Sequence, residues 1–197
     1  MQAALAEERP ADVPCGDCNA CCRTSHFIHV RPEEKRALAR IPHRLLFPAP
    51  GLPPGNLVLG YDKTGCCPML VDGRCTIYEE RPLACRTYDC RIYAAAGVTA
   101  DRAAIAEQVR RWRFTHPSRE DRDREAAVRA AARFIREHPE SLPGEAARRE
   151  PVRVAVLAIA VHEEFLRGVT GAAGPRPSDR QKARAVVIAN EKLFADG

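Results

Sequence analysis

The hydrophobic positions in the second half of the chain recur every three or four residues, as expected for amphipathic helices. Such a period, with Ile105 and Trp112 on one face, predicts a first helix that Thr99 caps at its N-terminus. Ser118 precedes a second run of the same kind, which predicts a helix ending before Pro139. These residues are therefore expected to form surface helices that cover a common core.

Two more helices are predicted further along. Residues 150–167 are apolar on most faces, carry Pro151 in their first turn and end before Gly168, which predicts a deeply buried helix. Ser178 is the expected cap of the last helix. This helix is expected to carry the apolar residues Val186, Val187, Ile188, Leu193 and Phe194. Four helices joined by short or Pro/Gly-rich segments predict a small four-helix bundle.

The first half lacks this period and is rich in turn residues, as in "FPAPGLPPGN" (47–56). A short helix is predicted within residues 32–40, and a single helical turn is predicted to start at Pro82. The segments "NLVLGYD" and "CPMLVDGRCTIY" resemble short strands, and Asp72 with Gly73 predicts a hairpin turn in the second. The predicted fold is mainly α. A loop-rich cysteine-cluster region with a short β-hairpin (1–95) precedes a helical region (96–197), and the two can also form one integrated domain.

All nine cysteines lie in the first of these regions, four of them crowded into "CGDCNACC" (15–22). Buried cysteines that act as small hydrophobes do not explain such density on a polar loop. A redox pair needs only two cysteines. We therefore expect two groups of four metal ligands, with Cys66 as an extra thiol. The predicted ligands are Cys15, Cys18, Cys21, Cys22, Cys67, Cys75, Cys85 and Cys90.

Composition narrows the classes of function. The N-terminal segment has neither the basic start nor the apolar stretch of a signal peptide, and no run of residues has the length of a membrane span. We therefore expect a cytoplasmic protein whose thiols stay reduced, which also disfavours disulfides. The net charge of +5 is mild and its charges are interleaved, without aromatic residues between them to stack bases. This pattern speaks against nucleic-acid binding.

Thiolates select zinc or iron–sulfur clusters among the common metal groups. Zinc knuckles take two ligands from one C-x2-C pair, whereas the C-x2-C-x2-C run resembles the one that wraps a cubane cluster. The third cysteine therefore favours iron–sulfur over zinc, and the spacing leaves one site and two sites both open. His26 and His29 follow the first group and could supply a nitrogen ligand. Five arginines near the cysteines could balance thiolate charge: Arg23, Arg74, Arg81, Arg86 and Arg91.

Taken together, "CGDCNACC" and "CCPMLVDGRCTIYEERPLACRTYDC" (66–90) resemble the CxxCxxCC family, the YkgJ-type cysteine-cluster proteins described as zinc- or iron-chelating. The family pattern continues as CP-x-L, C-x-I-Y, an R-P pair, C-R and a final C. The resemblance covers residues 15–90 and implies that the eight cysteines named above bind metal. It also selects the following other residues: Pro68, Leu70, Ile77, Tyr78, Arg81, Pro82 and Arg86.

The leading functional hypothesis is a metal-binding protein whose helical region provides a scaffold or a surface for a protein partner. Flagellin lysine methylases carry a similar cysteine motif that is associated with an iron–sulfur cluster. That resemblance implies a cluster-dependent protein-modifying enzyme as one alternative. A redox or metal-trafficking protein is another. The sequence singles out no catalytic residue.

Overall fold

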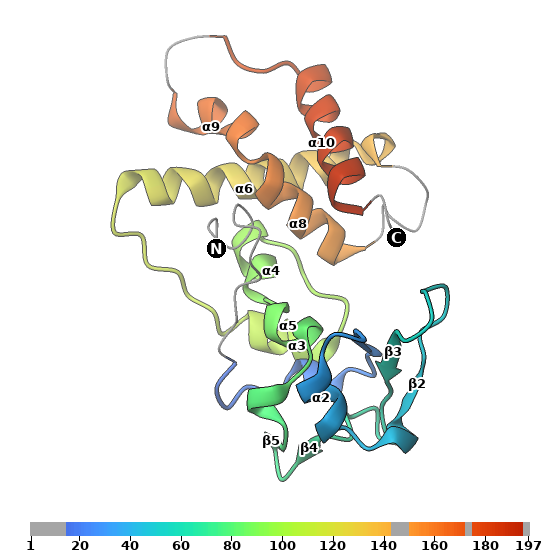
Figure 1. Cartoon of the computed structure of the whole chain (residues 1–197). Coiled ribbons are helices and arrows are strands. Elements are labelled where there is room, and N and C mark those ends of the chain that lie inside the picture. The colour runs from blue at the N-terminus through green and yellow to red at the C-terminus, as the bar shows by residue number, and fades with distance from the viewer. Residues whose placement is uncertain (1–14, 143–149, 172–174, 195–197) are drawn as a thin grey trace. The chain divides into compact units, whose positions relative to one another are not determined.

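The computed structural model describes residues 15–142, 150–171 and 175–194 (Figure 1). The expectations for residues 1–14 lie outside these ranges. The chain divides into two compact units. The first unit holds the residues up to Asp89 and also Arg102–Ile105, and the second holds Cys90–Asp101 and the residues from Ala106 onward. The helix α5 (Ala103–Val109) thus begins in the first unit and ends in the second.

A three-stranded antiparallel sheet organises the first unit. Its strands β1 (Ile28–Val30), β2 (Leu46–Pro48) and β3 (Leu57–Leu59) lie in the order β1-β3-β2. Leu59 is the partner of Ile28 on one side and of Leu46 on the other. Of these three strands, the sequence predicted only β3, within the segment "NLVLGYD". Pro48 occurs in β2 because that strand lies at an edge, where a missing backbone N–H disrupts no ladder.

The predicted hairpin is confirmed. The strands β4 (Leu70–Val71) and β5 (Arg74–Cys75) pair antiparallel, with Leu70 opposite Cys75. Asp72 and Gly73 have φ angles of 48° and 78°. Positive φ at both central residues is typical of a tight turn that matches the twist of its strands, and Asp-Gly is a favoured sequence there.

Short helices complete the first unit. The helix α2 (Lys35–Arg40) begins inside the predicted segment, and α3 (Leu83–Thr87) starts directly after Pro82, as predicted. The 3-10 turns are η1 (Cys21–Arg23), η2 (His43–Leu45) and η3 (Tyr78–Glu80). The carboxylate of Glu34 accepts hydrogen bonds from the backbone N–H groups of Arg31 and Leu83. It therefore fixes the start of α3 against the segment that precedes α2.

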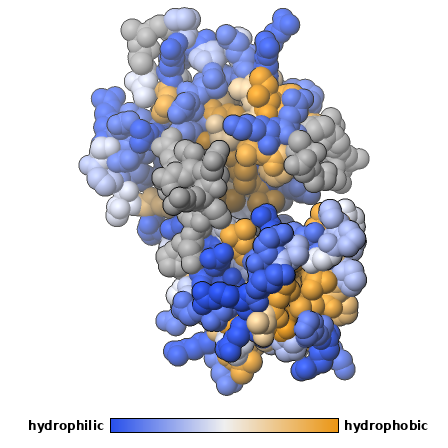
Figure 2. Space-filling view, viewed as in Figure 1, coloured by the Kyte–Doolittle hydropathy of each residue, from blue (hydrophilic) through white to orange (hydrophobic). Residues whose placement is uncertain are grey.

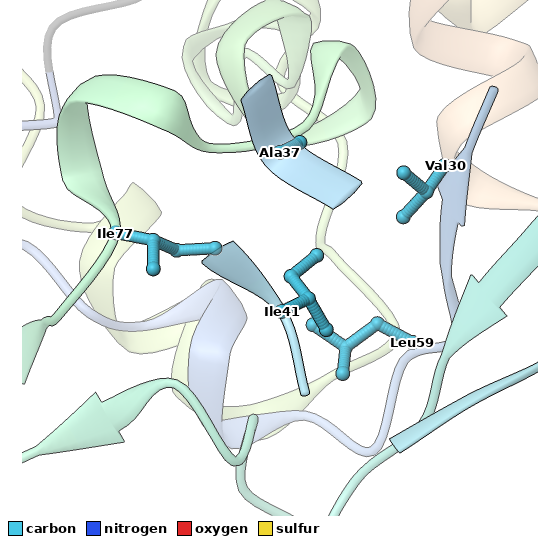
Figure 3. Packing of buried hydrophobic residues seen from close by; sticks show 5 residues of the cluster. All are labelled: Val30, Ala37, Ile41, Leu59 and Ile77. Atoms are coloured by element: carbon cyan, nitrogen blue, oxygen red, sulfur yellow. The ribbon is translucent and has the colours of Figure 1, made fainter. Parts of the chain in front are cut away.

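The hydrophobic core of the first unit is small (Figure 3). It consists of Val30, Ala37, Ile41, Leu59 and Ile77, each at most 4% exposed. Partly buried residues packed against it include the following three: Cys67, Met69 and Cys75. The apolar side chains that hold β1, α2 and β3 together therefore also support cysteines of the second group.

The second unit is helical, as predicted. Its elements are α4 (Arg91–Ala96), α6 (Arg119–Glu137), η4 (Pro139–Ser141), α8 (Pro151–Val161), α9 (Glu163–Thr170) and α10 (Asp179–Phe194). The long helix α6 packs against α4, α8 and α9, and α10 packs against α8. Small and branched residues fill the space between them, and Ala131, Leu157 and Val186 are fully buried.

Several helix predictions need correction. The third predicted helix is divided at His162 into α8 and α9, where Phe165 N–H bonds the His162 carbonyl in an i→i+3 turn. The helix α9 continues past the predicted end at Gly168 and ends at Thr170. Gly171, with a φ of 66°, follows it directly. The first predicted helix is α5, which begins at Ala103 and ends at Val109, so Thr99 does not cap it and Trp112 lies beyond it. The helix α4 was not predicted. Three apolar residues of the last predicted helix, α10, are at least 36% exposed: Val187, Ile188 and Leu193.

The predicted cap of α6 is present and reciprocal. The Ser118 hydroxyl accepts a hydrogen bond from Asp121 N–H at 3.1 Å, and the Asp121 carboxylate accepts one from Ser118 N–H at 3.1 Å. We expect Ser118→Ala to lower the free energy of unfolding of this unit by about 1 kcal/mol, because it leaves an N-terminal N–H group without its acceptor. Ser118→Asp, which keeps an acceptor, is the control. Urea unfolding followed by circular dichroism measures both, and equal midpoints for Ser118→Ala and the wild type would contradict the prediction.

Exposed aromatic side chains gather next to β3. Phe27, Phe47 and Tyr61 are 63%, 52% and 43% exposed, and the ring centroids of Phe27 and Tyr61 are 5.1 Å apart. Gly60 lies beside both phenylalanine rings, and a Cβ atom there would make ordinary van der Waals contacts, 3.4 Å from Phe47 and 3.7 Å from Phe27. Hydrophobic surface is visible over this part of the first unit in Figure 2. Among the helices that the structure describes, none has the combined length and apolar character needed to cross a membrane.

Candidate metal centre

Consecutive tight turns wind the first cysteine segment. Cys18 N–H bonds the Cys15 carbonyl at 3.0 Å, and Cys22 N–H bonds the Asn19 carbonyl at 3.1 Å. Gly16, inside the first turn, has a φ of 55°, a conformation that glycine adopts without strain. The 3-10 turn η1 then follows directly. An extended backbone would spread these thiols over a long distance, whereas the turns keep them on one compact loop.

Backbone hydrogen bonds join this loop to the second cysteine segment. Cys67 N–H donates to the Cys22 carbonyl at 2.7 Å, across a sequence separation that includes the whole three-stranded sheet. The side-chain amide of Asn19 donates to the carbonyl of Gly73, in the hairpin turn, at 2.9 Å. The two cysteine segments are therefore neighbours in the first unit.

Seven of the eight predicted ligands line one cavity of about 300 Å³ in the first unit. The other walls are mainly apolar or aromatic, and His26 and Arg81 also line the cavity. Residues 15–22 and 67–85, which carry cysteines of both predicted groups, thus meet at this cavity. The cysteines that line it are Cys15, Cys18, Cys21, Cys22, Cys67, Cys75 and Cys85.

The remaining two cysteines differ from these seven. Cys90 belongs to the second unit, where its Sγ accepts a hydrogen bond from the indole N–H of Trp112 at 3.4 Å. Its role as a ligand stays a prediction. Cys66, predicted as the extra thiol, is not among the residues that line the cavity. Its backbone closes a turn in which Asp62 accepts from Cys66 N–H at 3.0 Å.

A second cavity, of about 260 Å³, adjoins some of the same thiols. Cys18, Cys22 and Cys75 line both cavities, together with Tyr78. The second cavity is more polar, because Asp17, Asn19 and Arg74 contribute to its walls. These three thiols are therefore reachable from two sides, whereas the other four line only the apolar cavity.

The adjacent thiols of Cys21 and Cys22 shift the pKa values of each other in opposite directions. The Cys22 thiol donates a hydrogen bond to the Cys21 sulfur, which lowers the pKa of Cys21 to about 7. The same bond raises the pKa of Cys22 well above its usual range, and burial adds to this effect. Cys21 is thus the thiol of this pair that ionises first.

Two cysteines of the second segment resist ionisation. Burial raises the pKa of Cys85, neighbouring thiols raise it further, and the charge of Arg81 partly opposes them. Burial is also the largest cause of the raised pKa of Cys67. Thiolates are the metal-binding form of cysteine, so metal binding at these positions must displace protons.

His26 is oriented by Thr24. The Thr24 hydroxyl donates its single proton to the Cys21 carbonyl at 2.6 Å, so the 2.8 Å contact with His26 requires a proton on His26 Nδ1. His26 lines the cavity, as expected of a possible nitrogen ligand. His29 is not among the lining residues, and its Nε2 contacts the Asn56 side chain at 2.8 Å.

The donor set fits a thiophilic metal by its chemistry, because several thiols converge on one largely apolar cavity. The ligand geometry is not formed. In residues 15–142, 150–171 and 175–194, no group of three or more His, Cys, Asp or Glu side chains is arranged to hold a metal ion as it stands.

Some lining residues had no role in the sequence prediction. Phe27, Met69 and Tyr88 contribute apolar and aromatic walls, and no spacing rule distinguishes them from ordinary core residues. Tyr78 belonged to the family pattern without an assigned role, whereas Arg81 was also one of the five arginines expected to balance thiolate charge. Both line the cavity in the structure.

A comparison with protein-family models supports the resemblance. Residues 14–108 match the CxxCxxCC model, whose description reads "Putative zinc- or iron-chelating domain". The match includes all nine cysteines and ends before α6. Among curated proteins and solved structures, nothing matches the chain significantly. Residues 14–108 of this chain, just under half of its length, are therefore similar to the CxxCxxCC family.

Proposed function

We propose that the CxxCxxCC domain of this protein binds metal through the thiolates of its cysteine cavity. One observation carries the proposal, namely that seven cysteines from two separate segments line a single cavity. Cys67 and Cys85 are free thiols and not half of a disulfide, which is the state that metal binding needs. Such thiols persist in a reducing compartment, and we propose the cytoplasm.

The number of thiols supports a site with more than one metal ion. A mononuclear zinc site is complete with four ligands, whereas seven cysteines surround this cavity. Two zinc ions would use the excess, whereas one iron–sulfur cluster would take four of the cysteines and leave the others outside its ligand set. The run of Cys15, Cys18 and Cys21 favours the cluster, because a cubane can take three ligands from one loop. Cys90 is retained as the proposed eighth ligand. We also propose that the domain is of the YkgJ type.

Protein purified without oxygen should then be brown. We expect a broad absorption near about 400 nm from sulfur-to-iron charge transfer, together with iron and acid-labile sulfide. The filled d shell of zinc gives no such band. Absorption spectroscopy with metal and sulfide analysis of the same anaerobic sample measures all three quantities.

Other outcomes separate the remaining possibilities. A colourless preparation that contains about two zinc ions per chain and no labile sulfide would assign the cavity to zinc. A fully reduced protein that retains neither metal, and takes up neither after reconstitution, would contradict the proposed function itself.

A further inference from the structure

Arg81 places a permanent positive charge at the cysteine cavity. It is 8% exposed and is the single arginine or lysine among the described residues that line this cavity. A guanidinium group stays protonated in proteins, so burial cannot neutralise it. The sequence suggested several nearby arginines as partners of thiolates. Of these arginines, Arg81 lines the first of the two cavities described above and Arg74 lines the second.

Contacts with Tyr78 fix the guanidinium group. Arg81 Nη1 donates to the Tyr78 carbonyl at 2.7 Å, and the guanidinium carbon lies 3.9 Å from the centroid of the Tyr78 ring. The Tyr78 hydroxyl in turn accepts a hydrogen bond from Gly16 N–H at 3.2 Å. Tyr78 therefore connects Arg81 to the turn between Cys15 and Cys18.

A metal–thiolate group in this cavity would carry a net negative charge. Four thiolates around a divalent ion, or around a doubly charged cubane, leave about −2 in surroundings of low effective dielectric. Burying such a charge without a compensating cation is costly.

We infer that Arg81 compensates the charge of the metal–thiolate group and thereby sets the affinity of the cavity for metal. This inference rests on the proposed function. It assigns Arg81 an electrostatic role outside the ligand set, because guanidinium is a hydrogen-bond donor and has no lone pair to offer a metal.

Zinc binding by purified, fully reduced protein tests the inference, with Zn²⁺ alone as the probe and a chromophoric chelator as competitor. Arg81→Gln should weaken zinc binding by about 10–100-fold, the range found when residues around the ligands of a metal site are changed. Arg81→Lys keeps the charge and should restore most of the affinity. The control is Arg36→Gln, which removes the same charge from a side chain that is 82% exposed and lies 3.5 Å from Glu80. It should bind zinc like the wild type.

The pH dependence separates a charge effect from a structural one. Without the cation, protons compete better with the metal, so the loss in Arg81→Gln should be larger in mildly acidic than in mildly basic buffer. Wild-type affinity in Arg81→Gln would overturn the inference. So would equal losses in the Gln and Lys variants at every pH, because a structural contact would then explain both. If Arg81→Gln does not fold, the affinity and pH profile of Arg81→Lys decide alone. If the wild type itself binds no zinc and no iron, the proposed function fails.

Discussion

Replacing Cys67 by serine should lower the affinity of the protein for metal by at least about 100-fold, whereas the same change at its neighbour Cys66 should leave it unaltered. Cys67 lines the cavity together with the cysteines of the first segment, and its backbone N–H donates to the Cys22 carbonyl. A serine hydroxyl is a harder ligand that stays protonated, and it does not replace a thiolate on zinc or iron–sulfur.

The adjacent pair makes this a matched experiment. Cys66→Ser removes one sulfur from the same stretch of chain. It keeps the backbone N–H of residue 66, which donates a hydrogen bond to the Asp62 carboxylate. Metal content per chain after anaerobic purification, and chelator competition, measure both variants beside the wild type. Equal losses in the two variants would show that the segment matters only for folding. If Cys67→Ser has the metal content and affinity of the wild type, Cys67 is not a ligand.

Removing the metal should loosen the first unit and leave the helices of the second unit formed. The core of the first unit contains few buried side chains, and its sheet strands are three residues long. Structural zinc contributes roughly 10–16 kcal/mol in small domains, as much as the whole stability of an ordinary domain. Metal binding is therefore expected to supply most of the folding free energy of this unit.

Hydrogen exchange with and without a chelator, under reducing conditions, measures the effect segment by segment. Peptides from 15–89 should lose most of their protection when metal is withdrawn. Peptides from α6 and α8 are the internal control, because Ala131, Ala132, Leu157 and Ala158 are fully buried between helices that contain no cysteine. Equal protection of both units in the metal-free protein would contradict the prediction.

Elements with local chemical signals could be predicted from the sequence. The Asp72–Gly73 turn and the Ser118 cap depend on residues within three positions of each other, and both were recognised. The strands β1 and β2 were missed, since three residues carry no measurable period and each strand exists through its pairing with β3. The division at His162 was missed for a related reason. The apolar pattern continues through it, while the backbone turns to pack α9 against α6.

The candidate site shows the same limit. Spacing alone separated the cysteines into two groups and set Cys66 apart. It could not show that Cys18, Cys22 and Cys75 line two cavities, because this depends on how the hairpin meets the first loop. Nor could it distinguish Arg81 from the other arginines near cysteines, since burial against Tyr78 is a property of the folded unit.

The bond between Cys67 N–H and the Cys22 carbonyl has a consequence for the unfolded chain. These two residues are about 45 positions apart, and β1, α2, β2 and β3 all lie between them. A metal bound by both side chains would act as a cross-link that closes this long loop. By the chain-entropy relation used for disulfides, closing a loop of that length lowers the entropy of the unfolded state. This raises the free energy of the unfolded state by about 4 kcal/mol and stabilises the folded unit by the same amount. The sheet could then keep its short strands, because the cross-link would limit the freedom that its segment gains on unfolding.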